Sequence, residues 1–163
     1  MKPIFHATES DLIAFGKIIL LWGHVEANLA GILLSLYHPY NQIQDRGGVP
    51  IKFSTKIRHA IHGYCNVRRM APIRKEAKAL INSLIPLHEQ RSIIAHGYYQ
   101  GVHGEGLGYH EFGLYESRDG ERKRWRFHNF TGPQLQRLTS DIAKAWTDME
   151  DLSAKTYRIA MSK

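Results

Sequence analysis

Apolar residues recur every three to four positions through four stretches of the chain, and this period predicts four helices. The first stretch runs from a cap at Thr8 or Ser10 to about Tyr37, before Pro39. The second is "STKIRHAIHGYCNV" (54–67), the third covers residues 73–96, and the fourth runs from Pro133 to about residue 160. Because the third stretch contains Pro86, which has no backbone N–H, we expect a kink or a break there.

The ends of these stretches carry residues that start and stop helices. Thr8 or Ser10 can cap the first helix, Ser54 the second and Thr131 the last, because each side-chain oxygen can accept a hydrogen bond from a free backbone N–H. Gly97 follows the third helix, as glycine commonly does at a helix C-terminus.

Residues 98–130 change to an alternation of apolar and polar positions that is typical of strands. "HEFGLYESRDGERKRWRFHNF" predicts a hairpin with a two-residue turn at Asp119-Gly120, and "YYQGVHGEG" before it can add a third strand. That turn would set three pairs on one face: Phe112–Phe127, Leu114–Trp125 and Glu116–Lys123. The other face would then present to solvent the basic residues Arg122, Arg124, Arg126 and His128.

These elements predict a mainly α protein with a single domain over residues 1–163. We expect an antiparallel, four-helix-bundle-like frame with a β-hairpin inserted at about 98–130, between the third and fourth helices.

One charge interrupts the apolar stripe on each of two helices. Glu26 lies between Trp22 and Leu29 on the first helix, and a carboxylate there needs a cation or several hydrogen bonds. Arg91 lies on the stripe of the third helix, so the two charges suggest an ion pair. The pair either fixes the helix register or lets Glu26 aim the guanidinium at a cleft or a dimer interface.

His96 follows Arg91 by five residues, which is about 140° further round an ideal helix. The two side chains share a face only if the helix end loosens or if a second subunit brings them together. The negative end of the helix dipole favours the protonated ring of His96. An imidazole that moves protons and a guanidinium that neutralises charge on a phosphate are what phosphodiester cleavage needs.

"RSIIAHG" (91–97), at the end of a helix, resembles the R-x(4–6)-H motif of the HEPN superfamily. The long first helix with "WGHVEANL" also resembles the first helix of that family. The resemblance covers the helical frame and leaves the hairpin as an insert. HEPN proteins are helical bundles and usually homodimers, and many are metal-independent endoribonucleases of toxin–antitoxin, abortive-infection and other defence systems.

The resemblance implies a role for each residue of the motif. Arg91 would bind the scissile phosphate and His96 would act as general acid or base, with Glu26 and Ser92 in support. The RNA 2′-hydroxyl would attack and leave a cyclic phosphate, without a metal or a cofactor. The resemblance further implies a homodimer, RNA as the substrate and a cognate antitoxin protein as a possible partner.

Ser92 departs from the Asn, Asp or His that often follows the arginine in active members. The alternative is therefore a catalytically inactive HEPN-like dimer that binds RNA or a partner protein. A third hypothesis is a structural or regulatory dimer with no role in nucleic-acid binding, in which Glu26 and Arg91 are only a core pair.

The net charge of the chain bears on which partner these hypotheses favour. The formal net charge is +7, which favours an anionic partner, most simply RNA. The basic strand residues Arg122, Arg124, Arg126 and His128 form either a solvated face or a track for RNA phosphates that leads to the cleft.

Other classes of protein fit the sequence less well. The single cysteine excludes an intrachain disulfide and suits a reducing compartment. Because Lys17, His24 and Glu26 interrupt the apolar first helix, we expect a buried helix without a membrane and a cytoplasmic protein. His59 and His62 lie three apart, but no carboxylate or cysteine cluster completes a site, so we expect no metal.

Overall fold

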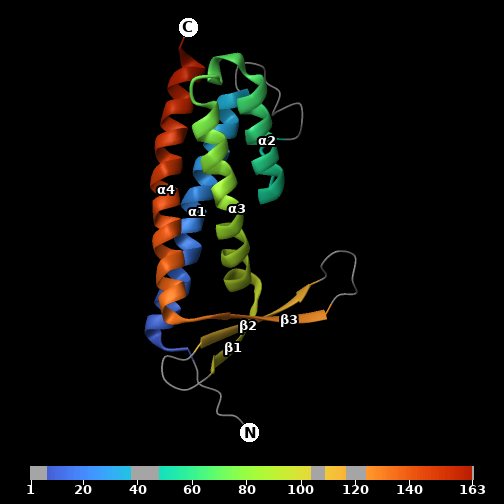
Figure 1. The fold of residues 1–163 in the computed structure, drawn as a ribbon, viewed down its shortest axis with the longest axis vertical. Helices are drawn as coiled ribbons and strands as arrows, with labels where there is room; N and C mark the ends of the chain where they lie inside the picture. The colour runs from blue at the N-terminus through green and yellow to red at the C-terminus, as the bar shows by residue number, and fades with distance from the viewer. Residues whose placement is uncertain (1–6, 38–47, 104–108, 117–123, 163) are drawn as a thin grey trace. The chain divides into compact units, whose positions relative to one another are not determined.

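The computed structural model describes residues 7–37, 48–103, 109–116 and 124–162, and it is mainly helical with a small sheet between its third and fourth helices (Figure 1). The helices are α1 (Glu9–Tyr37), α2 (Phe53–Asn66), α3 (Arg74–His96) and α4 (Gly132–Met161), with a short 3-10 helix, η2 (Arg68–Met70). The strands are β1 (Tyr98–His103), β2 (Tyr109–Glu116) and β3 (Arg124–Phe130). This order confirms the four helices and the β insert, which gains the third strand.

The chain forms two compact units. The sheet unit comprises residues 1–20 and 86–141, and therefore holds the sheet with the first turns of α1, the last turns of α3 and the first turns of α4. The helical unit comprises residues 21–85 and 142–163 and holds α2, η2 and the remainder of those three helices. The single domain and the four-helix bundle stay predictions.

Two helices begin with reciprocal hydrogen bonds of the capping-box kind. The backbone N–H of Thr8 donates to Asp11 Oδ2 at 2.8 Å, and the N–H of Asp11 donates to Thr8 Oγ1 at 3.2 Å. Thr131 and Gln134 form the same arrangement at the start of α4, at 2.8 and 3.3 Å. Thr8 and Thr131 are thus confirmed as caps, because each is followed three residues later by a side chain that returns the bond.

The cap predicted at Ser54 is wrong. Helix α2 begins at Phe53, its N-cap is Lys52, and no side chain caps it. Phe53 is buried and its ring lies 5.2 Å from that of Trp22. We infer that burial of this ring draws Phe53 into the first helical turn and moves the start of the helix ahead of the serine.

Pro86 does not break α3, which continues from Arg74 to His96. Proline removes the hydrogen bond to the carbonyl four residues earlier, on Asn82. Both Pro86 and Asn82 are exposed, so water can reach that carbonyl. Of the two expected outcomes, the break is therefore wrong, and the kink stays a prediction.

Gly97 ends α3 as expected, but the physical reason is lack of space. Its N–H donates to Ile93 O at 2.8 Å. Among the described residues, Gly48 and Gly101 have a positive φ and Gly97 does not, so a left-handed backbone is not what requires glycine here. A Cβ on Gly97 would lie 2.4 Å from Ile93 O and 3.0 Å from Phe112 Cβ. Only glycine lets the chain pass from α3 into β1 against Phe112.

The sheet has the antiparallel order β1–β2–β3, and its register differs by one residue from the predicted one. Gly113 pairs with Phe127, Leu114 with Arg126 and Tyr115 with Trp125. The predicted pairs Phe112–Phe127 and Leu114–Trp125 are therefore wrong, and the predicted turn at 119–120 lies outside the described residues. Because side chains alternate between faces, this offset exchanges the two faces of β3 relative to β2.

Burial of Phe130 explains the observed register. The ring of Phe130 is buried and packs edge-on against Phe112 at 5.9 Å, and Phe112 packs on Phe15 of α1 at 5.4 Å. Phe130 and Phe112 share a face only when Phe112 lies opposite His128, as it does here. Under the predicted register Phe130 would point to the other face.

Helix α1 is long and apolar enough to cross a membrane by length and composition, with a mean hydropathy of 1.5. The core helix of a soluble protein passes the same test. Ile18, Trp22, Val25 and Leu29 of α1 are fully buried within the protein.

Replacement of Gly97 by alanine should lower the free energy of unfolding by about 1–3 kcal/mol, because the new methyl group overlaps a helix carbonyl oxygen. Gly16 of α1 is the matched control, since a Cβ there meets nothing within 4 Å. Gly16→Ala should raise stability by about 0.5–1 kcal/mol. Urea denaturation measures both, and a Gly97→Ala variant as stable as wild type would contradict the close approach of Gly97 to Phe112.

Candidate active site

The last turns of α3 carry the predicted catalytic residues, and the first of them is Arg91. Its side chain is half-buried in the sheet unit. Its Nε is buried and has no hydrogen-bond partner among the residues that the structure describes. A buried donor on a permanently charged group is costly without an acceptor. The Nε of Arg91 therefore keeps an unused hydrogen-bond donor among the described residues, while the side chain as a whole is only half-buried.

His96 is the last residue of α3 and is exposed. The helix does not loosen before it, because the next N–H, of Gly97, still bonds to Ile93 O at 2.8 Å. On a regular helix His96 and Arg91 diverge by about 140°. The expectation that a loosened helix end brings the two side chains together is therefore wrong, and a site shared with a second subunit stays a prediction.

Ser92 has a neighbour that the sequence did not single out. Its Oγ lies 3.4 Å from Nε2 of His88, one turn earlier on α3. Both side chains are half-buried. His88, Ser92 and His96 are spaced by four residues, so they follow one another along one side of the helix. The serine hydroxyl is thus engaged within α3.

Glu26 is placed in the helical unit, where Trp22 and Lys56 contact its carboxylate. Trp22 Nε1 donates to Oε1 at 2.8 Å, and Lys56 Nζ of α2 donates to Oε2 at 2.9 Å. The predicted need for a cation and hydrogen bonds is met by these groups. Arg91 belongs to the other unit, and its pairing with Glu26 stays a prediction.

The observed register changes the face of the sheet on which the basic residues of β3 lie. Arg124 is exposed, whereas Arg126 and His128 are half-buried and lie on the face of the sheet that carries Phe112. The expectation that all of these residues face solvent opposite an inward Trp125 is therefore wrong. Arg122 lies outside the described residues. Among the basic residues in the described part of β3, Arg124 is the most exposed and is therefore the one that a phosphate could reach most easily.

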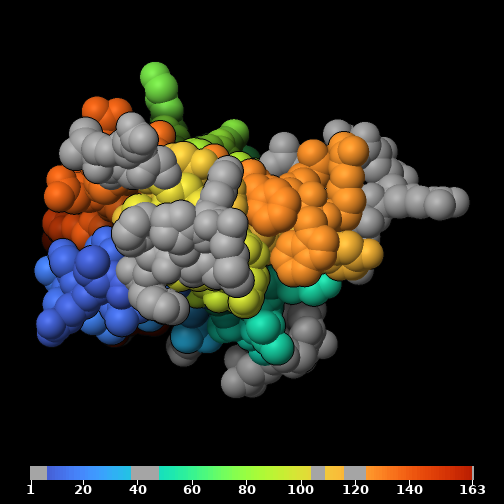
Figure 2. Space-filling model, turned by 90° about the horizontal axis from the view of Figure 1, so that it is seen from below, coloured from blue at the N-terminus to red at the C-terminus, as the bar shows by residue number. Residues whose placement is uncertain are grey.

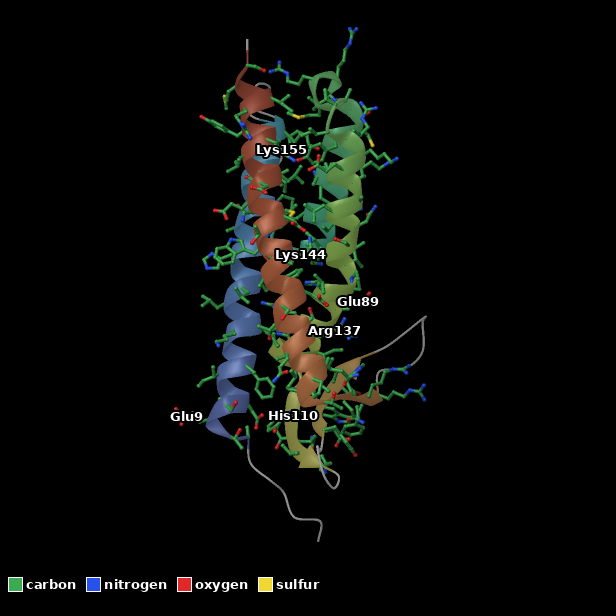
Figure 3. The ribbon with its side chains drawn as sticks, turned by 60° about the vertical axis from the view of Figure 1, so that its left-hand side comes forward. Glu9, Glu89, His110, Arg137, Lys144 and Lys155 are labelled. Atoms are coloured by element: carbon green, nitrogen blue, oxygen red, sulfur yellow. The ribbon has the colours of Figure 1, made fainter. Side chains whose placement is uncertain are left out.

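A buried histidine links the start of α1 to the sheet. His110 of β2 is 7% exposed; its Nε2 lies 3.3 Å from Asp11 Oδ1, and its Nδ1 lies 3.1 Å from the Tyr99 hydroxyl (Figure 3). Phe15 packs edge-on against the ring at 5.5 Å. In the tautomer with its proton on Nε2, the ring donates a hydrogen bond towards the Asp11 carboxylate. Its Nδ1 can then accept a hydrogen bond from the Tyr99 hydroxyl.

The hydrogen bonds in this cluster act on the pKa values of its members. Burial acts to raise the pKa of Asp11, but hydrogen bonds from Thr8 and the charge of His110 outweigh it and hold that pKa below the ordinary 3.8. Burial, and then the charge of Asp11, raises the pKa of Tyr99. The cluster therefore favours a charged carboxylate beside a neutral phenol. His110 was not among the predicted site residues, although its alternation with Phe112 along the strand indicates a position on the same face as that apolar residue.

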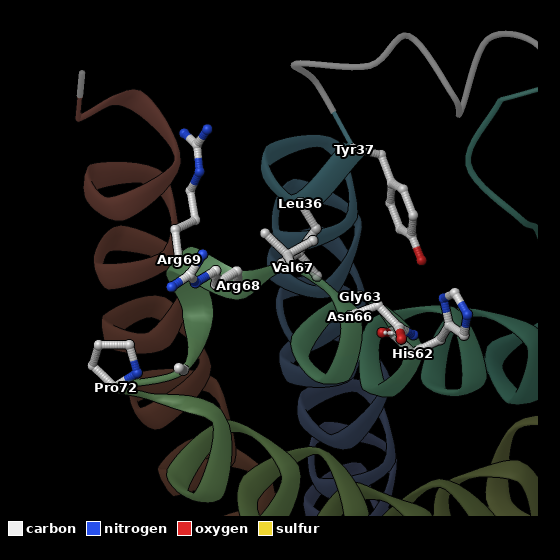
Figure 4. Close-up of a pocket in the computed structure, with 10 residues that line it drawn as sticks. Leu36, Tyr37, His62, Gly63, Asn66, Val67, Arg68, Arg69 and Pro72 are labelled. Atoms are coloured by element: carbon white, nitrogen blue, oxygen red, sulfur yellow. Dashed lines mark hydrogen bonds between the residues drawn. The ribbon is translucent and has the colours of Figure 1, made fainter.

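A hollow of about 880 Å³ lies in the helical unit, lined by residues that include His62, Arg68 and Arg69 (Figure 4). Arg69 Nη1 donates to Ala160 O at 2.7 Å, near the end of α4. Arg74 Nε likewise donates to Tyr64 O at 2.8 Å, in the last turn of α2. These two arginines therefore bind carbonyls near helix ends, where cations are favoured.

Comparisons with known proteins do not assign a family. No family model matches the chain, and no curated protein or solved structure matches it significantly. Within the described residues, no group of three or more His, Cys, Asp or Glu side chains could hold a metal ion.

Asp11→Asn should destabilise the protein at pH 7 by about 1 kcal/mol, because it removes the charge that accepts from Thr8 and faces His110. Since folding lowers the pKa of Asp11, its contribution is complete above pH 3.8 and is lost as the pH falls through the folded-state value. Urea denaturation at pH 7 and about pH 3 should show the difference from wild type shrinking in acid. The exposed Asp141 provides the control Asp141→Asn; an equal loss in both variants at pH 7 would contradict a specific role for Asp11.

Proposed function

We propose that the protein is a metal-independent endoribonuclease of HEPN type that acts as a homodimer, as a toxin or defence effector. The observation that carries the proposal is the buried Nε of Arg91, which has no acceptor among the described residues. A guanidinium binds phosphate through several N–H groups in one plane, so an RNA phosphate would supply the acceptor. The net charge of +7 favours the approach of that substrate.

His96 would transfer the protons of the reaction. It is exposed at the end of α3, so a substrate can reach its ring. Acting as general base, it would take the proton of the RNA 2′-hydroxyl as O2′ forms a bond to phosphorus. The bond from phosphorus to O5′ would break, the leaving oxygen would take a proton from water, and a 2′,3′-cyclic phosphate would remain.

The homodimer follows from the direction of the two side chains. Arg91 and His96 diverge on a helix that stays regular to its end. A two-fold axis beside the two α3 ends would set Arg91 of one copy near His96 of the other, and would do so twice. Arg91 would stabilise the charge that develops on the phosphate, and His96 would supply the acid–base step. An antitoxin that covers this cleft would inhibit cleavage.

A catalytically inactive dimer that binds RNA or a partner protein is the second candidate. The observation that favours it is the contact of Ser92 Oγ with His88, at 3.4 Å, which occupies the hydroxyl in the supporting position. This candidate shares the fold and the basic character of the first. It differs in that neither Arg91 nor His96 would alter the RNA.

Cleavage of a structured RNA in EDTA tests the proposal. Wild-type protein should produce fragments that end in a 2′,3′-cyclic phosphate, and RNA methylated at the 2′-oxygens should resist cleavage. His96→Ala should lower the cleavage rate by about 10²–10⁴-fold, the usual loss when a general acid or base is removed. Arg91→Ala should lower it by about 10²–10³-fold.

Matched variants separate a chemical effect from a general one. His62→Ala removes another exposed histidine, Arg137→Ala removes an exposed arginine of α4, and both variants should cleave like wild type. Equal cleavage by His96→Ala and wild type would overturn the assignment of the site. Binding of RNA without cleavage by wild type would support the inactive dimer instead.

A further inference from the structure

Four large aromatic side chains lie uncovered on one face of the sheet. They are the aromatic face, Tyr98, Tyr115, Trp125 and Phe127, with exposed fractions of 65, 59, 54 and 56%. All four lie on the face opposite to Phe112. In Figure 2 the orange side chains of β3 form an open surface beside the yellow atoms of β1 and β2. Aromatic rings of this size are usually mostly buried, so this exposed group points to a ligand.

A glycine in the middle strand shapes the face. Gly113 pairs with Tyr98 on one side and with Phe127 on the other, so the two aromatic residues flank it in one row. A Cβ on Gly113 would lie 3.2 Å from Phe127 Cε1 and 3.3 Å from Trp125 Cε3. The rings of β3 therefore lie over bare backbone. A hollow of about 420 Å³ is lined by Tyr98, Gln100, Trp125 and Phe127.

The walls of this hollow favour a flat ligand. Rings that stand beside an open slot can stack on another ring, and Gln100 can hydrogen-bond to its edge. The hollow itself is lined by uncharged side chains, and the chain as a whole carries a net charge of +7, which favours an anionic ligand. A flat ring attached to an anionic backbone matches both properties, and this is the structure of a nucleotide chain.

The spacing of the rings distinguishes single strands from duplexes. Trp125 and Phe127 are two residues apart on one strand, so their backbone positions are about 7 Å apart. Successive bases in a duplex are stacked at about 3.4 Å and turn their edges to a protein. Bases that stack on these rings must therefore be unpaired and separated from one another.

We infer that the aromatic face is a stacking platform for the unpaired bases of single-stranded RNA. This deepens the proposed function, and rests on it for the choice of RNA, because it names the part of the substrate that the insert would recognise. Binding at the platform does not require cleavage. The residues differ from the predicted phosphate contacts, since Trp125, Phe127 and Tyr98 would bind bases, whereas Arg124 alternates with Trp125 and lies on the other face of the sheet.

Fluorescence anisotropy with His96→Ala protein in EDTA tests the platform on uncleaved RNA. The probes are a labelled single strand of about 12 nucleotides, its duplex, and a strand of equal length without bases. The single strand should bind more tightly than both of the others. In this background Trp125→Leu and Phe127→Leu should each weaken single-strand binding by about five- to 150-fold, the usual effect of losing one base–ring stack.

Two further variants sharpen the test. Gly113→Ala keeps every ring but places a methyl group against the rings of Phe127 and Trp125 and displaces them, so it should weaken single-strand binding while the protein stays folded by circular dichroism. Tyr157→Leu removes an equally exposed aromatic ring from α4 and should bind like the parent.

Three outcomes would overturn the platform. These are equal binding by Trp125→Leu and the parent, equal binding of the strand without bases, or conversion of a dimer to a monomer by Trp125→Leu, since the face would then be a contact between copies. The test is independent of the nuclease proposal. If RNA binding depends on the rings but wild-type protein cleaves no RNA, the platform is retained and the nuclease is rejected. If wild-type protein cleaves RNA but binding does not depend on the rings, the nuclease is retained and the platform is rejected.

Discussion

The pairing of Gly113 with Phe127 is the constraint from which the surface of the sheet unit follows. It lets Phe130 join Phe112 in the interior, where both rings are buried. The same pairing turns Trp125 and Phe127 outward. Because side chains alternate strictly along a strand, a shift of one residue would bury these rings and expose Phe130. One step of hydrogen-bond register thus decides whether the exposed face of the insert presents rings or cations.

Local signals in the sequence predicted local structure correctly. Thr8 and Thr131 were found as caps because the partner of each lies only three residues away. Where a distant residue decides, the prediction was wrong. Burial of Phe53 against Trp22 overrides the cap at Ser54, and burial of Phe130 overrides the register that a two-residue turn would impose. Packing of this kind cannot be obtained from spacing alone.

In the candidate site, too, local sequence predicts some features, and distant residues decide the others. The apolar stripe predicted that Glu26 needs partners, but it could not identify Lys56 and Trp22, which the tertiary fold supplies. The cluster of Asp11, His110 and Tyr99 joins α1 to two strands far along the chain. In contrast, the divergence of Arg91 and His96 follows from helix geometry, and the regular end of α3 upholds it. This divergence is what makes a second copy necessary to the proposed chemistry.

Mixing two inactive proteins tests that requirement most directly. Arg91→Ala and His96→Ala proteins would be combined under conditions in which subunits exchange, and cleavage of RNA in EDTA would be measured. If Arg91 of one copy works with His96 of the other, each mixed dimer regains one intact site, and random exchange restores about a quarter of wild-type activity. A mixture that forms mixed dimers, detected by native mass spectrometry, but cleaves no RNA would contradict a site shared between two copies.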